Sequence, residues 1–225
     1  MTRASQGRRK LRGAVFDLDG TLIDSGGDIV AATLHALETE GFPAQPAEQL
    51  LTYVGDGARP LLARAAGIES GDPRVEALYE SFIRYYQAHP VVHTRLCAGA
   101  DGALRALSSL ALALCTNKPR VTTLPVLAAL GLSGFFRVVI AGGDLPKTKP
   151  DPFPILHIAE RLGLAPAELV MVGDGAQDIL SGRAAGAFTV GVRGGIQPIE
   201  RLLAAEPDVL LDTMAELPAA LEDLL

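Results

Sequence analysis

The stretch AVFDLDGTLID, residues 14–24, guides the interpretation of the whole chain. It opens with a short apolar run, residues 14–16, of the kind that forms a buried strand in a parallel sheet. The run ends at Asp17, and a second acidic residue, Asp19, precedes the turn residue Gly20. Buried carboxylates cost free energy unless a partner compensates their charge. We therefore interpret this strand end as part of a functional site.

The composition excludes two classes of partner. The 225 residues carry a formal net charge of −6, whereas a protein that binds nucleic acid needs a basic face for the phosphate backbone. The longest apolar stretch, residues 104–115, is too short to span a bilayer. Two cysteines do not make a disulfide framework, which favours a reducing compartment. We expect a cytoplasmic monomer or homodimer that contacts neither nucleic acid nor membrane.

Short apolar runs alternate with helical patterns along most of the chain. The predicted strands are residues 14–16, 111–115, 137–140, 169–172, 188–192 and 209–211. The predicted helices between them are residues 100–107, 122–130, 152–162 and 178–185. This alternation predicts an α/β fold with a Rossmann-like, doubly wound parallel sheet.

The connection between the first two predicted strands is much longer than the others. Helical periodicity in residues 27–39, 58–66 and 74–89, with no convincing strand, predicts an inserted all-helical module, because a structureless loop of this length would be unusual. We expect two domains: a catalytic core of residues 1–24 and 97–225, and a helical cap of residues 25–96.

Four polar motifs follow predicted strands, where ligands bind in open parallel sheets. They are residues 17–21, 116–119, 147–150 and 173–178. Clustered carboxylates repel one another unless a cation neutralises them, and Mg²⁺ suits such oxygen ligands beside a phosphate. A lysine, a hydroxyl, an amide and backbone N–H groups supply anion donors. The sequence therefore predicts a metal ion next to a bound phosphate.

The same motifs carry a resemblance to a known family. FDLDGTLIDS resembles the nucleophile motif of the haloacid dehalogenase superfamily, and CTN, KPDP and VGDGAQD are similar to its other three motifs, in the same order. The resemblance covers residues 13–192 and implies a Mg²⁺-dependent phosphatase with a helical cap. Many members have serine where Gly175 stands, so a hydrogen bond beside the metal is either missing here or provided by the backbone.

The resemblance also implies a role for each position. Asp17 would be the nucleophile that forms an aspartyl-phosphate, and Asp19 would protonate the leaving oxygen and then activate water. Lys149, which directly precedes proline, is favoured over Lys147 as the lysine that neutralises charge. The implied metal ligands are Asp17, Asp19 (through its backbone carbonyl), Asp174 and Asp178. The implied phosphate-binding residues are Gly20, Thr116, Asn117 and Lys149.

The cap gives a narrower indication of the substrate. Residues 52–65, TYVGDGARPLLARA, resemble the cap segment of phosphoglycolate phosphatases, which implies 2-phosphoglycolate as the substrate. A Gly-Asp-Gly loop, residues 55–57, could close over it, with Arg59, Arg64 or Lys118 meeting its carboxylate. Alternative activities are a phosphosugar mutase similar to β-phosphoglucomutase, a pyrophosphatase and a nucleotidase. A non-enzymatic phosphate sensor or scaffold is a further alternative.

Overall fold

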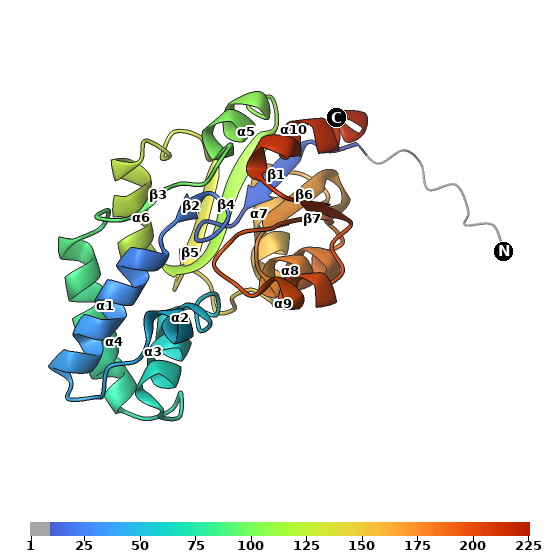
Figure 1. Ribbon diagram of the computed structural model, residues 1–225. Helices are drawn as coiled ribbons and strands as arrows, with labels where there is room; N and C mark the ends of the chain where they lie inside the picture. Colours follow the sequence, from blue (N-terminus) through green and yellow to red (C-terminus); the bar gives the residue numbers. More distant parts are fainter. Residues whose placement is uncertain (1–9) are drawn as a thin grey trace.

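The core is a parallel β-sheet at whose carboxyl edge an inserted group of helices packs (Figure 1). The computed structural model describes residues 10–225. Six strands lie in the order β5-β4-β1-β6-β7-β8, and every neighbouring pair is parallel. They are β1 (Gly13–Phe16), β4 (Ala111–Pro119), β5 (Val138–Gly142), β6 (Leu169–Gly173), β7 (Phe188–Val192) and β8 (Val209–Leu211). The predicted doubly wound α/β core is confirmed.

Helices cover both faces of this sheet. They are α5 (Ala100–Ala106), α6 (Arg120–Ala129), α7 (Phe153–Leu162), α8 (Ala176–Ala185), α9 (Ile199–Ala204) and α10 (Leu217–Leu221), with 3₁₀ turns η1 (Pro166–Glu168), η2 (Met214–Glu216) and η3 (Glu222–Leu224). Successive side chains of a strand point to opposite faces, so Phe16 packs in one apolar cluster with Leu104 of α5, while Val15 packs in another with Ile155 of α7. Because both faces are covered, β1 is buried throughout.

The predicted helical insertion stands between β1 and β4 (Figure 1). Its helices are α1 (Gly26–Thr39), α2 (Ala47–Leu51), α3 (Ala58–Ala66) and α4 (Arg74–Ala88). Three of them match predicted helices, whereas α2 is too short for a helical pattern to stand out in the sequence. Within residues 10–225, no helix combines the length and the apolar character needed to cross a membrane.

Two short strands join the insertion to the core. β2 (Ile23–Asp24) pairs with β3 (Arg95–Leu96) in an antiparallel ribbon, with Ile23 opposite Leu96. The sequence analysis expects no strand here, because two residues are too few to show alternation. The carboxylate of Asp28, in the first turn of α1, also accepts hydrogen bonds from the backbone N–H groups of residues 92–94. The chain therefore enters and leaves the insertion along one ribbon.

Candidate active site

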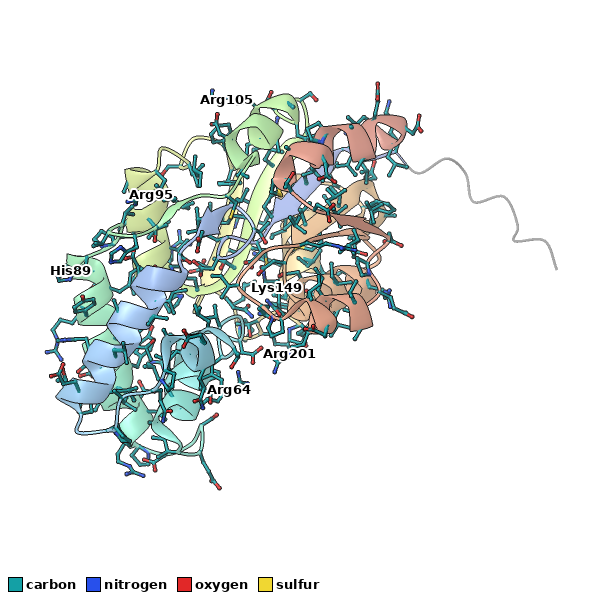
Figure 2. The ribbon with its side chains drawn as sticks, viewed as in Figure 1. Arg64, His89, Arg95, Arg105, Lys149 and Arg201 are labelled. Carbon is teal, nitrogen blue, oxygen red and sulfur yellow. The ribbon has the colours of Figure 1, made fainter. Side chains whose placement is uncertain are left out.

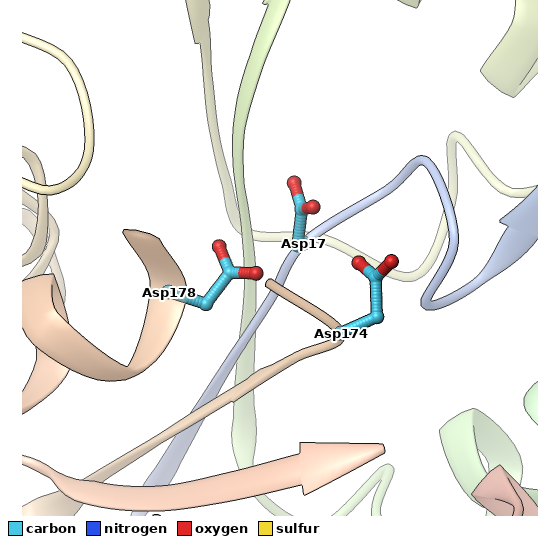
Figure 3. Close-up of side chains that lie close together, drawn as sticks. All are labelled: Asp17, Asp174 and Asp178. Carbon is cyan, nitrogen blue, oxygen red and sulfur yellow. The ribbon is translucent and has the colours of Figure 1, made fainter. Parts of the chain in front are cut away.

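Three acidic side chains from separate parts of the chain meet at the carboxyl edge of the sheet (Figure 3). Asp17 follows β1, Asp174 follows β6, and Asp178 lies in the first turn of α8. All three are buried, and one carboxylate oxygen from each lies within 4.8 Å of the others. Because β1 and β6 are paired neighbours, their ends place Asp17 beside Asp174. The structure thus brings together three of the four carboxylates selected from the sequence.

A buried ammonium group neutralises part of this cluster. Lys149, which lies in the segment between β5 and α7 and is labelled in Figure 2, places its Nζ 2.8 Å from Asp17 Oδ1 and 2.6 Å from Asp178 Oδ1. It also donates to the backbone oxygen of Cys115 at 2.6 Å. Burial lowers the pKa of Lys149, but the two carboxylates outweigh that effect and raise it above its usual value. Lys147 instead forms an ion pair at the surface, so only Lys149 reaches the cluster.

The cluster carries more negative charge than Lys149 neutralises. Burial, together with repulsion from Asp17 and Asp178, raises the pKa of Asp174 to about 8. Burial also raises the pKa of Asp178 to about 7, although Lys149 acts in the opposite direction. These shifts reflect the cost of holding the carboxylates together without a further cation. A set of carboxylate oxygens suits a hard divalent cation, so these three residues can hold a metal ion.

The turn after β1 leaves space for Asp174. Gly20 has a φ of +85°, and a Cβ added there would lie 2.2 Å from Asp174 Oδ2. The backbone N–H of Gly20 donates to the backbone oxygen of Ile23 at 2.7 Å, so this donor is engaged within the turn. Asp174 is fixed by the Thr21 hydroxyl, which donates to Oδ1 at 3.2 Å, and by the N–H of Ile196, which donates to Oδ2 at 2.9 Å. Glycine therefore allows a close approach that any side chain would obstruct.

Gly175 supplies the backbone hydrogen bond considered in the sequence analysis. Its N–H donates to Asp178 Oδ2 at 3.0 Å. A Cβ at this position would lie 2.2 Å from Gln177 Nε2, so the glycine also leaves space for that amide. The orientation of Asp178 consequently does not depend on a side chain at position 175.

Asp19 is placed differently from the three clustered carboxylates. It accepts the Ser25 hydroxyl at 2.6 Å and the Lys118 ammonium at 3.0 Å, and it lines the same cavity as Asp17. Burial lowers the pKa of Lys118, but Asp19 and the Tyr86 hydroxyl raise it by more, so the net shift is upward. Asp17 and Asp19, two positions apart in the sequence, thus pair with different lysines: Asp17 with Lys149 and Asp19 with Lys118.

β4 runs on through Pro119, beyond the predicted strand of residues 111–115, so the motif of residues 116–119 is its last part, and it contributes one cavity-lining hydroxyl and one structural amide. Thr116 Oγ1 lines the cavity and accepts the backbone N–H of Lys118 at 3.2 Å. The Asn117 amide donates to the backbone oxygens of Gly55 at 2.8 Å and of Lys149 at 2.9 Å, and its Oδ1 accepts the Lys149 N–H at 3.1 Å. Asn117 therefore orients the lysine segment and links it to the insertion.

The cavity between core and insertion has two chemically different sides. Its volume is about 40 Å³, which is room for a few water molecules. The core contributes most of the polar side chains: Asp17, Asp19, Thr116, Asn117, Lys118, Thr122, Asp174 and Gln197. The insertion contributes only apolar side chains and glycines: Ile29, Val54, Gly55, Gly57, Ala58, Leu61 and Phe82.

Two predicted cap cations lie outside the cavity lining. Arg59 forms a two-pronged ion pair with Glu76, at 2.7 and 2.9 Å, and its guanidinium lies 3.7 Å from the centroid of the Tyr79 ring. Arg64 pairs with Asp56 at 2.6 Å. Of the three cations predicted to meet a substrate carboxylate, the structure brings only Lys118 to the cavity.

Sequence reasoning missed two residues at the boundary between core and insertion. Gln197 donates from Nε2 to the backbone oxygen of Val54 at 2.9 Å, and it lies in the loop after β7. The strand-end rule that selected the other motifs also applies to this loop. Tyr86 lies one helical turn after the buried Phe82, and its hydroxyl accepts from Lys118 Nζ at 2.8 Å. A hydroxyl in the buried stripe of α4 was the available signal.

Comparisons with known proteins agree with this geometry. A family model described as haloacid dehalogenase-like hydrolase matches residues 14–192. A phosphoglycolate phosphatase of Neisseria meningitidis is 37% identical over 216 residues, 92% of each chain, and one of Salmonella paratyphi A is 36% identical, covering 95% of this chain and 93% of its own. The crystal structure of a predicted phosphoglycolate phosphatase from Haemophilus somnus has a TM-score of 0.86 at 28% identity and covers 95% of this chain and 99% of its own. With the four motifs at the strand ends and a match along most of its length, the chain belongs to the haloacid dehalogenase-like hydrolases.

Proposed function

We propose that the protein is a Mg²⁺-dependent phosphatase that hydrolyses a small phosphate monoester, 2-phosphoglycolate in particular, through an aspartyl-phosphate. The observation that carries this proposal is the meeting of Asp17, Asp174, Asp178 and Lys149 at the edge of the sheet, with Asp19 in the same cavity. The names of the most similar relatives support the choice of substrate.

In the proposed reaction Asp17 attacks phosphorus, and the bond between phosphorus and the ester oxygen breaks. Asp19 gives its proton to the leaving oxygen and then takes a proton from the water that attacks the aspartyl-phosphate. That attack releases inorganic phosphate and regenerates the Asp17 carboxylate. Mg²⁺ would be held by Asp17, Asp174, Asp178 and the backbone carbonyl of Asp19, and it would neutralise charge on the phosphate.

The hydrogen bonds within the protein show which of the predicted phosphate-binding residues still have a donor for the phosphate. The Thr116 hydroxyl accepts a backbone N–H, which leaves its own proton to donate to a phosphate oxygen. Lys149 supplies positive charge beside Asp17. Gly20 and Asn117 use their donors within the protein, so we propose that they shape the site and do not hold the phosphate directly.

We also propose that residues 25–96 act as a cap domain on a core of residues 10–24 and 97–225; residues 1–9 of the predicted core lie outside the described residues. The β2–β3 ribbon supports this division, because it joins the two parts next to both boundaries. The cavity has room for only a few water molecules, so we propose that the cap moves when the substrate enters.

The first test is Mg²⁺-dependent phosphate release from p-nitrophenyl phosphate. We expect activity in the wild type and a loss of about a thousandfold or more in Asp17→Asn, because the amide is not a nucleophile. Asp101→Asn, a change of the same kind on the exposed face of α5, should retain full activity. A wild type without phosphate release in the presence of Mg²⁺ would favour the phosphate-sensor alternative.

A panel of phosphate esters tests the substrate. We expect 2-phosphoglycolate to give a higher kcat/KM than phosphosugars, nucleotides or pyrophosphate. A phosphosugar that is converted to an isomer without free phosphate would replace the phosphatase proposal with a mutase.

A further inference from the structure

Lys118 is the one cation that lines the cavity among residues 10–225. Arg59 and Arg64 are held by Glu76 and Asp56 outside it, and Lys149 is held by carboxylates and a backbone oxygen. Any anionic group on a substrate, apart from the phosphate, therefore has a single positive side chain to meet.

Residues from both parts of the molecule hold this ammonium group. Lys118 Nζ lies 3.0 Å from Asp19 Oδ1, and it donates to the hydroxyl of Tyr86 on α4 at 2.8 Å. The Tyr86 residue is 1% exposed, and the ammonium lies 4.3 Å from the centroid of its ring. Lys118 Nζ also lies 3.3 Å from Asp19 Oδ2, and because an ammonium group has three donors, this longer contact is the one that a further acceptor can replace. Ser25 also donates to Asp19, which keeps a partner if Lys118 shifts.

Within residues 10–225, the cap side of the cavity lining carries no hydrogen-bonding side chain, since Tyr86 reaches Lys118 from outside this lining. Its lining side chains, including Ile29, Leu61 and Phe82, are apolar. The hydroxyls of a sugar would lose water there without gaining side-chain partners, whereas one carboxylate can be satisfied by Lys118. The lining therefore favours a short substrate with a single negative group next to its phosphate ester.

We propose that Lys118, positioned by Tyr86 of the cap, is the receptor for a carboxylate of the substrate and sets the preference for carboxylated phosphate esters. On binding, the substrate carboxylate takes a place on the Lys118 ammonium beside or instead of Asp19. Tyr86 is a positioning residue that acts through Lys118, and it completes this subsite only when α4 lies over the core. The inference rests on the proposed phosphatase function and specifies the substrate class.

The test compares two esters that differ at one group: 2-phosphoglycolate and ethyl phosphate, which has a methyl in place of the carboxylate. The measured quantity is the ratio of their kcat/KM values with Mg²⁺ in the full-length protein. We expect the wild type to prefer 2-phosphoglycolate, Tyr86→Phe to lower the ratio about tenfold, and Lys118→Met to lower it about a hundredfold or more. The loss should lie mainly in KM for 2-phosphoglycolate, because the carboxylate is bound before and during the reaction.

Tyr85→Phe is the matched control, since Tyr85 is the neighbouring residue on α4 and stacks on His35, 4.7 Å between ring centroids. It should leave the ratio unchanged. A wild-type ratio near one, or a ratio that both Tyr86→Phe and Lys118→Met leave intact, would overturn the inference while the phosphatase proposal stands. Release of phosphate from neither ester would overturn both.

Discussion

The two sides of the cavity differ in charge and in how firmly they are held. The core side consists of carboxylates, hydroxyls, amides and one ammonium group, and many of these groups are hydrogen-bonded to backbone. The cap side consists of apolar side chains and glycines on an insertion that the β2–β3 ribbon joins to the core. Under the proposed function, the core would carry the chemistry and the cap would control which molecules reach it.

Three side-chain hydrogen bonds run from the core to the loop before α3 and to α4. Asn117 donates to Gly55, Gln197 donates to Val54, and Lys118 donates to Tyr86. Each bond runs from a core side chain to the cap, and two of the acceptors are backbone oxygens of the loop before α3. These three bonds need no charged group on the cap, because the core supplies their donors.

The largest expected effect tests the electrostatic strain of the core side. The pKa of Asp174 is raised to about 8, whereas an unfolded aspartate has its ordinary value near 4. Between about pH 4 and 8 the unfolded chain loses this proton while the folded metal-free protein retains it, so stability falls as pH rises. Asp174 alone would contribute a loss on the order of 5 kcal/mol. We expect Mg²⁺ to oppose this loss, since it compensates the same charges.

Denaturant unfolding at pH 5, 7 and 9, with Mg²⁺ or with a chelator, measures this effect. The unfolding free energy with Mg²⁺ should exceed that with chelator by an amount that grows with pH. Asp174→Asn should flatten the pH dependence of the metal-free protein, whereas Asp212→Asn, at a side chain that is 76% exposed, should not. A metal-free protein whose stability is constant from pH 5 to 9 would contradict the strain described for the core side.

The next effect tests how tightly the turn at Gly20 packs against the Asp174 carboxylate. Gly20→Ala would place a Cβ 2.2 Å from Asp174 Oδ2, so the carboxylate must leave its bonds to Thr21 and Ile196. We expect a loss of about a hundredfold in kcat/KM, because the displaced group belongs to the proposed metal site. Gly41→Ala is the control: Gly41 also has a positive φ, +75°, but a Cβ there meets nothing within 4 Å.

Both variants share the conformational cost of alanine at positive φ, about 1 kcal/mol, and only Gly20→Ala adds the clash. Activity and thermal unfolding of the two proteins separate these contributions. Equal activities would show that the site tolerates displacement of Asp174.

The same contrast explains how far the sequence alone could lead. The core was predictable because buried strands give continuous apolar runs, and the sheet then brings the residues after each strand to one edge. Asp17 and Asp174 needed no knowledge of side-chain packing to be placed together. The cap was predictable only in outline, since helical periodicity shows which residues are buried but not which helix covers which group. Tyr86 and Gln197 were missed for this reason, and the pairing of Arg59 with Glu76 could not be foreseen, because the partners of all three lie on other elements.

The smallest expected effect tests whether Arg59 of the cap, which lies outside the cavity lining, takes no part in substrate binding. Arg59 was a candidate for the substrate carboxylate, yet it pairs with Glu76 over the Tyr79 ring on a side chain that is 49% exposed. Arg59→Gln should change kcat/KM for 2-phosphoglycolate by less than about twofold and stability by at most about 1 kcal/mol, as is usual for an exposed ion pair. Kinetics on both esters, beside Lys118→Met, provide the measurement. A large rise in KM for 2-phosphoglycolate in Arg59→Gln, with none in Lys118→Met, would mean that the cap rearranges on substrate binding to bring Arg59 inward and that the carboxylate is read from the cap side.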